Sequence, residues 1–172
     1  MSNQNLFLSN NDNAISNKYL EQGYIVVPVS DTDALSWIRE KFILIAREEL
    51  NISDDTSDSD MLNFIHERIS IPELNDFRLL IIKKINSLPD FRQKYYQIAK
   101  SYLDIIVGNE LSMQLKINLS IQLPKDESSL LPIHADTWSG DSPFEVVVWV
   151  PLVDCYKTKA MYILPPDKHQ VL

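Results

Sequence analysis

The sequence contains a single cysteine, Cys155, among its 172 residues. One cysteine excludes an internal disulfide and a cysteine-rich metal cluster, and it is typical of a protein in a reducing compartment. No apolar run approaches the ~20 residues that a membrane-spanning helix needs. The N-terminus also lacks the basic start and the long apolar stretch of a signal peptide. We therefore expect a cytoplasmic protein without a membrane partner.

Basic residues are outnumbered by acidic ones. The chain has 16 lysines and arginines against 24 aspartates and glutamates, so its formal net charge is -8. A field of this sign repels phosphate backbones, so we expect no nucleic-acid partner. Hydrophobic residues make up 45% and charged residues 23%, which is typical of a globular chain whose length suits one domain with a buried core.

The first 108 residues are predicted to be mostly helical. Residues 1–18 are rich in Asn and Ser and predict a loose arm, and residues 23–28 predict a short buried strand. Apolar residues then recur at three- and four-residue steps. The stretch 51–60 is rich in aspartate and serine and therefore predicts a solvated loop. It is not predicted to bind calcium, because it lacks the glycine and the final glutamate of an EF-hand loop. The predicted helices cover residues 33–50, 61–69, 73–88 and 90–107.

From Leu111 onward the apolar period changes from about 3.6 to 2. Apolar and polar residues alternate over residues 113–123, and this alternation is typical of a strand with one buried face. Two further strands are predicted at residues 144–150 and 160–164. A helical first half followed by a strand-rich second half indicates an α+β fold, with helices packed against an antiparallel sheet or roll.

The chain has three histidines, His66, His134 and His169, and His134 is the most informative. It stands two residues before Asp136, and side chains at i and i+2 project to the same side of an extended backbone. An imidazole and a carboxylate that converge in this way, together with one more histidine, form the facial triad of non-haem Fe(II) sites. Taken alone, such a tripeptide is more often a solvated turn.

Three sequence motifs follow one another along the chain. Residues 23–28 read Gly-Tyr-Ile-Val-Val-Pro before a capped amphipathic helix, His134 and Asp136 follow, and residues 149–169 run from Trp-Val-Pro to a turn that contains Pro166 and His169. Together they resemble the Fe(II)/2-oxoglutarate-dependent oxygenases of the phytanoyl-CoA dioxygenase-like kind. The similarity is closest to the subgroup associated with carbohydrate-modification gene clusters.

The resemblance implies a fold, a cofactor and roles for particular residues. The family fold is a double-stranded β-helix, or jelly roll, so we expect the helical half to pack on a partial jelly roll. His134 and Asp136 would bind Fe(II), while Asn118 and Gln122 would be neutral donors to the cosubstrate 2-oxoglutarate, and Trp149 would line its pocket. The implied activity is hydroxylation of a small polar substrate, such as a sugar or a nucleotide-linked sugar.

The sequence also departs from the family pattern. Asp167 and Lys168 stand where Gly and Ser are usual, and His169 matches the histidine of that turn. The family's distal iron-ligand histidine, and the arginine that binds the far carboxylate of 2-oxoglutarate, come later than Leu172. We therefore expect a single oxygenase-like domain, residues 19–172, whose C-terminal end is incomplete. Such a chain would bind Fe(II) weakly and turn over 2-oxoglutarate poorly or not at all, and its open sheet edges would cause low stability or self-association.

Two alternatives to an active oxygenase remain open at this point. The first is a catalytically inactive jelly-roll binding module or a truncated fragment. The second is a cupin-like metal protein of another reaction class, such as an isomerase.

Overall fold

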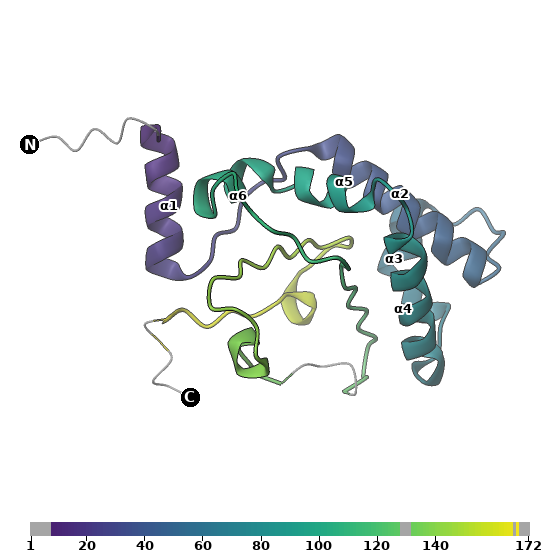
Figure 1. Ribbon diagram of the computed structural model, residues 1–172. Helices are drawn as coiled ribbons and strands as arrows, with labels where there is room; N and C mark the ends of the chain where they lie inside the picture. Colours follow the sequence, from purple (N-terminus) through teal and green to yellow (C-terminus); the bar gives the residue numbers. More distant parts are fainter. Residues whose placement is uncertain (1–7, 128–131, 167, 169–172) are drawn as a thin grey trace, which may run out of the picture.

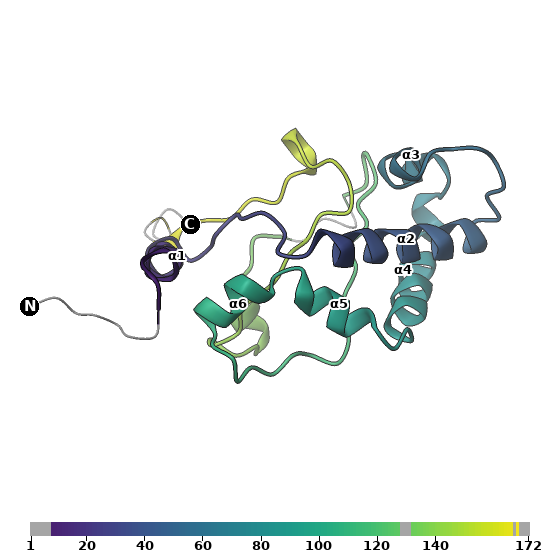
Figure 2. The same ribbon diagram turned by 90° about the horizontal axis from the view of Figure 1, so that it is seen from above.

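The computed structural model describes residues 8–127, 132–166 and 168. A group of helices surrounds several long extended segments (Figures 1 and 2). No helix of this described part is both long enough and apolar enough to cross a membrane. The α-helices are α1 (Asn10–Gln22), α2 (Thr32–Glu49), α3 (Asp58–Asn63), α4 (Ile71–Asn86), α5 (Phe91–Gln97) and α6 (Lys100–Ile106), and the short 3-10 turns are η1 (Ile65–Glu67), η2 (Asp136–Ser139) and η3 (Lys157–Lys159).

The core is built around α2, which contacts α3, α4 and α5. The helix begins at Asp31, whose side chain accepts a hydrogen bond of 2.8 Å from the backbone N–H of Ala34. Ala34, Ile38 and Phe42 follow at four-residue steps and are all buried, so one face of the helix is apolar. Phe42 meets Phe91 of α5 edge to face, with ring centroids 6.0 Å apart. This apolar face confirms the helix predicted over residues 33–50.

The predicted helix over residues 73–88 is also confirmed, as α4. It begins two residues earlier, because Ser70 and Glu73 form a capping box and Pro72 occupies the first turn. Its buried residues include Phe77 and Ile81, which lie on the predicted apolar stripe.

Two predicted helices are each divided in the structure. Residues 61–69 contain the end of α3 and the turn η1, and residues 90–107 contain α5 and α6. The second break occurs where Ile98 accepts a 2.8 Å hydrogen bond from the backbone N–H of Ser30. This contact joins the segment before α2 to the α5–α6 junction. The spacing of apolar residues within 90–107 gives no sign of it, because the partner lies far away along the chain.

The N-terminal predictions need correction. Within the expected loose arm, residues 10–18 form the first part of α1, because Ser9 and Asp12 make a capping box. Residues 24–28, expected as part of a buried strand, form no strand, and Val26 is 82% exposed. Gly23 ends α1 with a φ of 75°, and a Cβ at this position would lie 2.9 Å from Cγ of Pro166.

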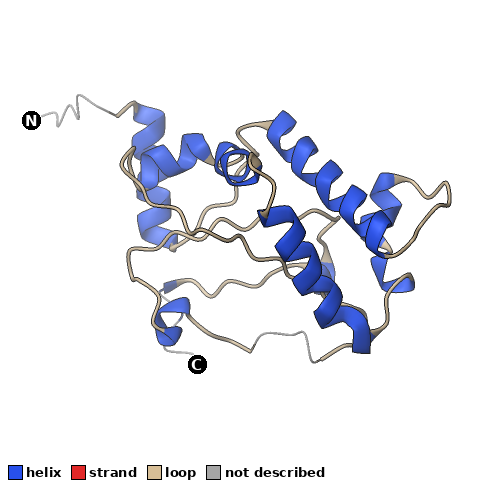
Figure 3. Ribbon diagram, turned by 45° about the vertical axis from the view of Figure 1, so that its right-hand side comes forward, coloured by secondary structure: helices blue, strands red, loops and turns tan. Residues whose placement is uncertain are grey.

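The predicted α+β fold with a partial jelly roll is wrong. Across the described residues there is no β-strand, so residues 113–123, 144–150 and 160–164 are extended or irregular without pairing (Figure 3). The alternation at 113–123 has another origin, because Ile117 and Leu123 are buried against the helices while Asn118 and Gln122 are exposed. A period of 2 reports alternate burial of side chains, and it does not require a neighbouring strand.

Helix side chains take the place of a neighbouring strand. The amide of Asn86, at the end of α4, donates to the carbonyl of Ile117 at 2.9 Å and accepts from its N–H at 2.8 Å. Arg92 of α5 donates to the carbonyls of Met113 at 2.9 Å and Gln114 at 3.2 Å. These bonds satisfy backbone groups that a sheet would otherwise have paired.

The later extended segment is attached in the same way. Tyr95 of α5 donates its hydroxyl to the carbonyl of Val148 at 2.6 Å, and burial raises the pKa of this hydroxyl to about 12. Asn63 of α3 accepts from the N–H of Asp154 at 3.1 Å and donates to its carboxylate at 3.3 Å. The second half of the chain is therefore held on the helices by side-chain hydrogen bonds.

We predict that Asn86→Ala lowers the free energy of unfolding by about 1–3 kcal/mol, because the partly buried N–H and C=O of Ile117 lose their partner. Chemical denaturation followed by circular dichroism measures this change. Asn75→Ala on an exposed position of the same helix is the matched control and should change stability by less than about 0.5 kcal/mol. Equal effects of the two substitutions would contradict the proposed role of Asn86.

Candidate functional site

His134 and Asp136 lie close together, as their spacing predicts. The intervening Ala135 has extended backbone angles, with φ -120° and ψ 138°, so both flanking side chains project to one side. His134 Nε2 and Asp136 Oδ1 are 3.6 Å apart. The turn η2 begins at Asp136 itself, which ends the extended stretch directly after the pair.

The other nitrogen of His134 determines the chemistry of the ring. Nδ1 lies 2.7 Å from the carbonyl oxygen of Pro132. A carbonyl can only accept a hydrogen bond, so Nδ1 carries the proton and the neutral ring keeps its lone pair on Nε2. This lone pair and the carboxylate of Asp136 are two electron-pair donors near one point. A proton on Nε2 or a metal ion between the two groups would relieve their mutual repulsion.

The pair is accessible from solvent, since the side chains of His134 and Asp136 are 43% and 52% exposed. Within the described part of the chain, no group of three or more His, Cys, Asp or Glu residues is arranged to hold a metal ion. His66 does not join the pair: it lies in η1, half-buried, with its ring 6.1 Å from that of Phe64. His169 and Asp167 lie outside the described residues.

The three residues expected to contact the cosubstrate are placed on the surface. Asn118, Gln122 and Trp149 are all exposed, and none of them makes a side-chain hydrogen bond within residues 8–127 and 132–166. Asn118 follows Ile117, whose backbone is held by Asn86. No hydrogen bond in this part of the chain joins any of the three to His134 or Asp136. Their side chains are available to a ligand, but the predicted cluster around the pair stays a prediction.

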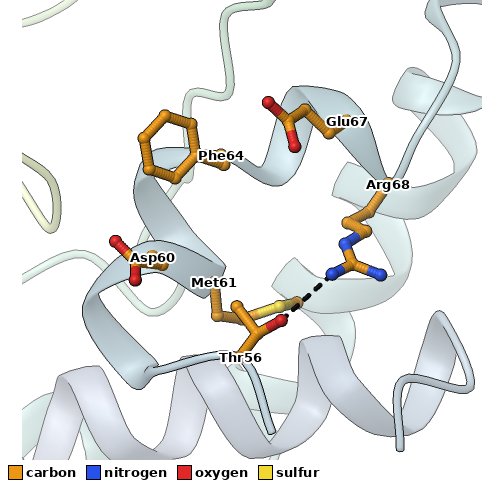
Figure 4. A pocket seen from close by; sticks show the side chains of 6 residues that line it. All are labelled: Thr56, Asp60, Met61, Phe64, Glu67 and Arg68. Carbon is orange, nitrogen blue, oxygen red and sulfur yellow. Dashed lines mark hydrogen bonds between the residues drawn. The ribbon is translucent and has the colours of Figure 1, made fainter. Parts of the chain in front are cut away.

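A pocket lies elsewhere in the described part of the chain. A cavity of about 260 Å³ is lined by residues of α3, of η1 and of the adjacent loops (Figure 4), namely Thr56, Asp60, Met61, Phe64, Glu67 and Arg68. None of these is a predicted site residue. A second cavity, of about 400 Å³, shares Arg68 and is lined mainly by residues of α4 and of the C-terminal end of α2.

Two arginines organise the loop beside the first pocket. Arg68 forms an ion pair with Asp54 at 2.8 Å and donates to the hydroxyl of Thr56 at 3.0 Å (Figure 4 shows the second bond). Arg47 of α2 donates to the carbonyls of Asp54 and Thr56. Hydrogen bonds from Thr56, with Arg68 adding to them, hold the pKa of Asp54 below its ordinary value. The aspartate-rich loop is thus tied to the helices, a result that its composition alone did not predict.

No protein-family model, curated protein or solved structure significantly matches the chain. The oxygenase resemblance therefore remains a prediction that rests on the motifs, and the geometry of the His134–Asp136 pair is the structural observation that bears on it.

We predict that the neutral imidazole of His134 is protonated on Nδ1, because the carbonyl of Pro132 accepts that proton. Long-range proton–nitrogen correlation spectra of the labelled protein distinguish the two tautomers. His66, whose ring lies beside Phe64, provides an internal comparison in the same spectrum. A neutral His134 ring with its proton on Nε2 would contradict the arrangement, since the nitrogen that faces Asp136 would then be unable to bind a metal.

Proposed function

We propose that His134 and Asp136 are the protein ligands of a non-haem Fe(II) site. We also propose that the chain functions in the 2-oxoglutarate-dependent hydroxylation of a small polar substrate. The observation that supports this most directly is the 3.6 Å separation of Nε2 and Oδ1, with the Nε2 lone pair directed by the Nδ1 bond to Pro132. The order of the family-like motifs along the chain supports it independently. The proposal does not rest on a jelly roll.

The donor types and their separation suit a divalent transition metal. Imidazole and carboxylate are two of the three ligands of the facial triad that leaves positions open on non-haem Fe(II). Two ligands of a facial triad with metal–ligand bonds of about 2.0–2.2 Å would have their donor atoms about 2.8–3.1 Å apart. The observed 3.6 Å therefore needs an approach of roughly half an ångström or somewhat more. Side chains that are half exposed make such an adjustment without moving the core.

The remaining contributions come from residues around the pair. The hydrogen bond of Pro132 to Nδ1 fixes the imidazole orientation, which is the usual role of an outer partner at a metal-binding histidine. Asn118 and Gln122 are exposed amides that can donate to a carboxylate cosubstrate. With Fe(II) bound, dioxygen would be the oxidant: one of its oxygen atoms would hydroxylate the substrate and the other would enter succinate as 2-oxoglutarate loses CO2.

Two donors from the protein hold a divalent ion less firmly than three. Fe(II) also lies near the weak end of the divalent series, so its binding to this pair alone should be weak. A binding module that retains a divalent cation without turnover is the second candidate, because the described residues add no third ligand to the pair. Binding and turnover must therefore be measured separately.

We predict that Asp136→Asn weakens binding of Fe(II), measured anaerobically by titration calorimetry, by roughly tenfold or more, because the neutral amide is a poorer ligand than a carboxylate. Asp141→Asn is the matched control: it removes an exposed carboxylate of the same segment and should leave the affinity unchanged. Equal affinity of the wild type and the Asp136→Asn variant would show that the metal does not bind at the pair.

We predict that succinate formation from 2-oxoglutarate, with added Fe(II) and ascorbate, is slow in this chain and is abolished by Asp136→Asn. The expected rate is low because two protein ligands do not constrain the open coordination positions. Metal binding that depends on Asp136 without any succinate would support the binding module. Succinate formation that is insensitive to both Asp136→Asn and His134→Gln would contradict the oxygenase proposal.

A further inference from the structure

Large apolar side chains are exposed along the second half of the chain, where Phe144 is 90% and Tyr162 83% exposed.

One part of this surface combines apolar and acidic side chains, and we call it the acidic patch. It consists of Trp138 in η2 and of Asp141, Phe144 and Glu145 after it, all of them exposed. Neither Asp141 nor Glu145 makes an ion pair with any other residue that the structure describes. The acidic patch therefore offers two unpaired carboxylates beside two exposed aromatic rings.

A second part combines an exposed aromatic ring with positive charge, and we call it the basic patch. It consists of Tyr156, Lys157 and Lys159 at η3. The ammonium of Lys159 lies 5.4 Å from the centroid of the Tyr156 ring, which is 58% exposed. Lys157 has a φ of 52°, an uncommon conformation for a residue with a side chain. Neither lysine has an ion-pair partner among the described residues.

The two patches lie on opposite sides of the molecule. In Figure 2, η3 projects on one side of the extended segments, while η2 lies on the other side. The patches of one chain are thus not placed to neutralise each other. A second copy of the chain carries the complementary patch for each of them.

We propose that copies of this chain associate head to tail, with the acidic patch of one copy against the basic patch of the next. Opposite charge and exposed aromatic rings on both patches provide complementarity. A contact between two different patches on opposite sides is heterologous, so copies add in a row and do not stop at a symmetric pair. A second copy of the chain supplies both complementary surfaces.

The experiment is a charge exchange followed by sedimentation velocity over a range of concentrations. The wild-type mass should rise with concentration beyond twice 19.9 kDa. The variant Lys157→Glu with Lys159→Glu has two acidic patches, and the variant Asp141→Lys with Glu145→Lys has two basic ones, so each alone should associate roughly tenfold or more weakly. An equimolar mixture of the two should regain association, because every acidic patch then meets a basic one.

Control variants distinguish loss of this contact from loss of folding and from nonspecific association. Lys18→Glu with Lys83→Glu changes the net charge as much as the reversal in the basic patch, but on α1 and α4, and it should associate like the wild type. Phe144→Ser should weaken association without altering the helical circular dichroism, since its side chain is exposed. None of the substitutions replaces His134 or Asp136, and the hydrogen bond from Asp141 to the carbonyl of Asp136 is made by the backbone N–H.

Three outcomes would overturn the proposal. A wild-type chain that stays monomeric at every concentration would show that the patches do not meet. A mass that stops at a dimer would exclude the head-to-tail arrangement. Two charge variants that do not associate when mixed, or that associate as well alone as the wild type does, would show that the contact is made by other residues.

Discussion

An extended backbone with no neighbouring strand must find its hydrogen bonds elsewhere, and this constraint determines how the second half of the chain is attached. Asn86 offers the same donor and acceptor as a peptide group, so its side chain can pair with both backbone groups of Ile117. Tyr95 and Asn63 act in a comparable way on Val148 and Asp154. The core of α2, α4 and α5 therefore supports the His134–Asp136 segment indirectly, through the chain on either side of it.

The helices were largely predictable because the information for them is local. Apolar spacing located α2 and α4, and the cap residues Asp31 and Ser70 lie at their first turns. Helix α1 was missed because it buries no residue and so shows no apolar period, although its capping box is present in the sequence. The break between α5 and α6 was missed for another reason, since it is made by a contact with Ser30, far away along the chain.

The same distinction between local and tertiary information applies to the predicted strands and to the candidate site. Alternation identified which residues of 113–123 face the helices, but pairing depends on a partner that no local pattern encodes. The approach of His134 to Asp136 was predictable, because it needs only one extended residue between them. The hydrogen bond from Nδ1 to Pro132 is equally local, yet it was not anticipated. The placement of Asn118, Gln122 and Trp149 relative to the pair depends on tertiary structure and was beyond the sequence.

The close approach of Gly23 and Pro166 has a topological consequence. Gly23 lies near the beginning of the described chain and Pro166 near its end, so the C-terminal end of α1 lies beside the last described residues. The entropic cost of closing so long a loop is modest, because it grows only with the logarithm of length, by about 0.6 kcal/mol for each doubling. The contact therefore fixes the C-terminal end of α1 beside the last extended segment at little more entropic cost than a much shorter loop would need.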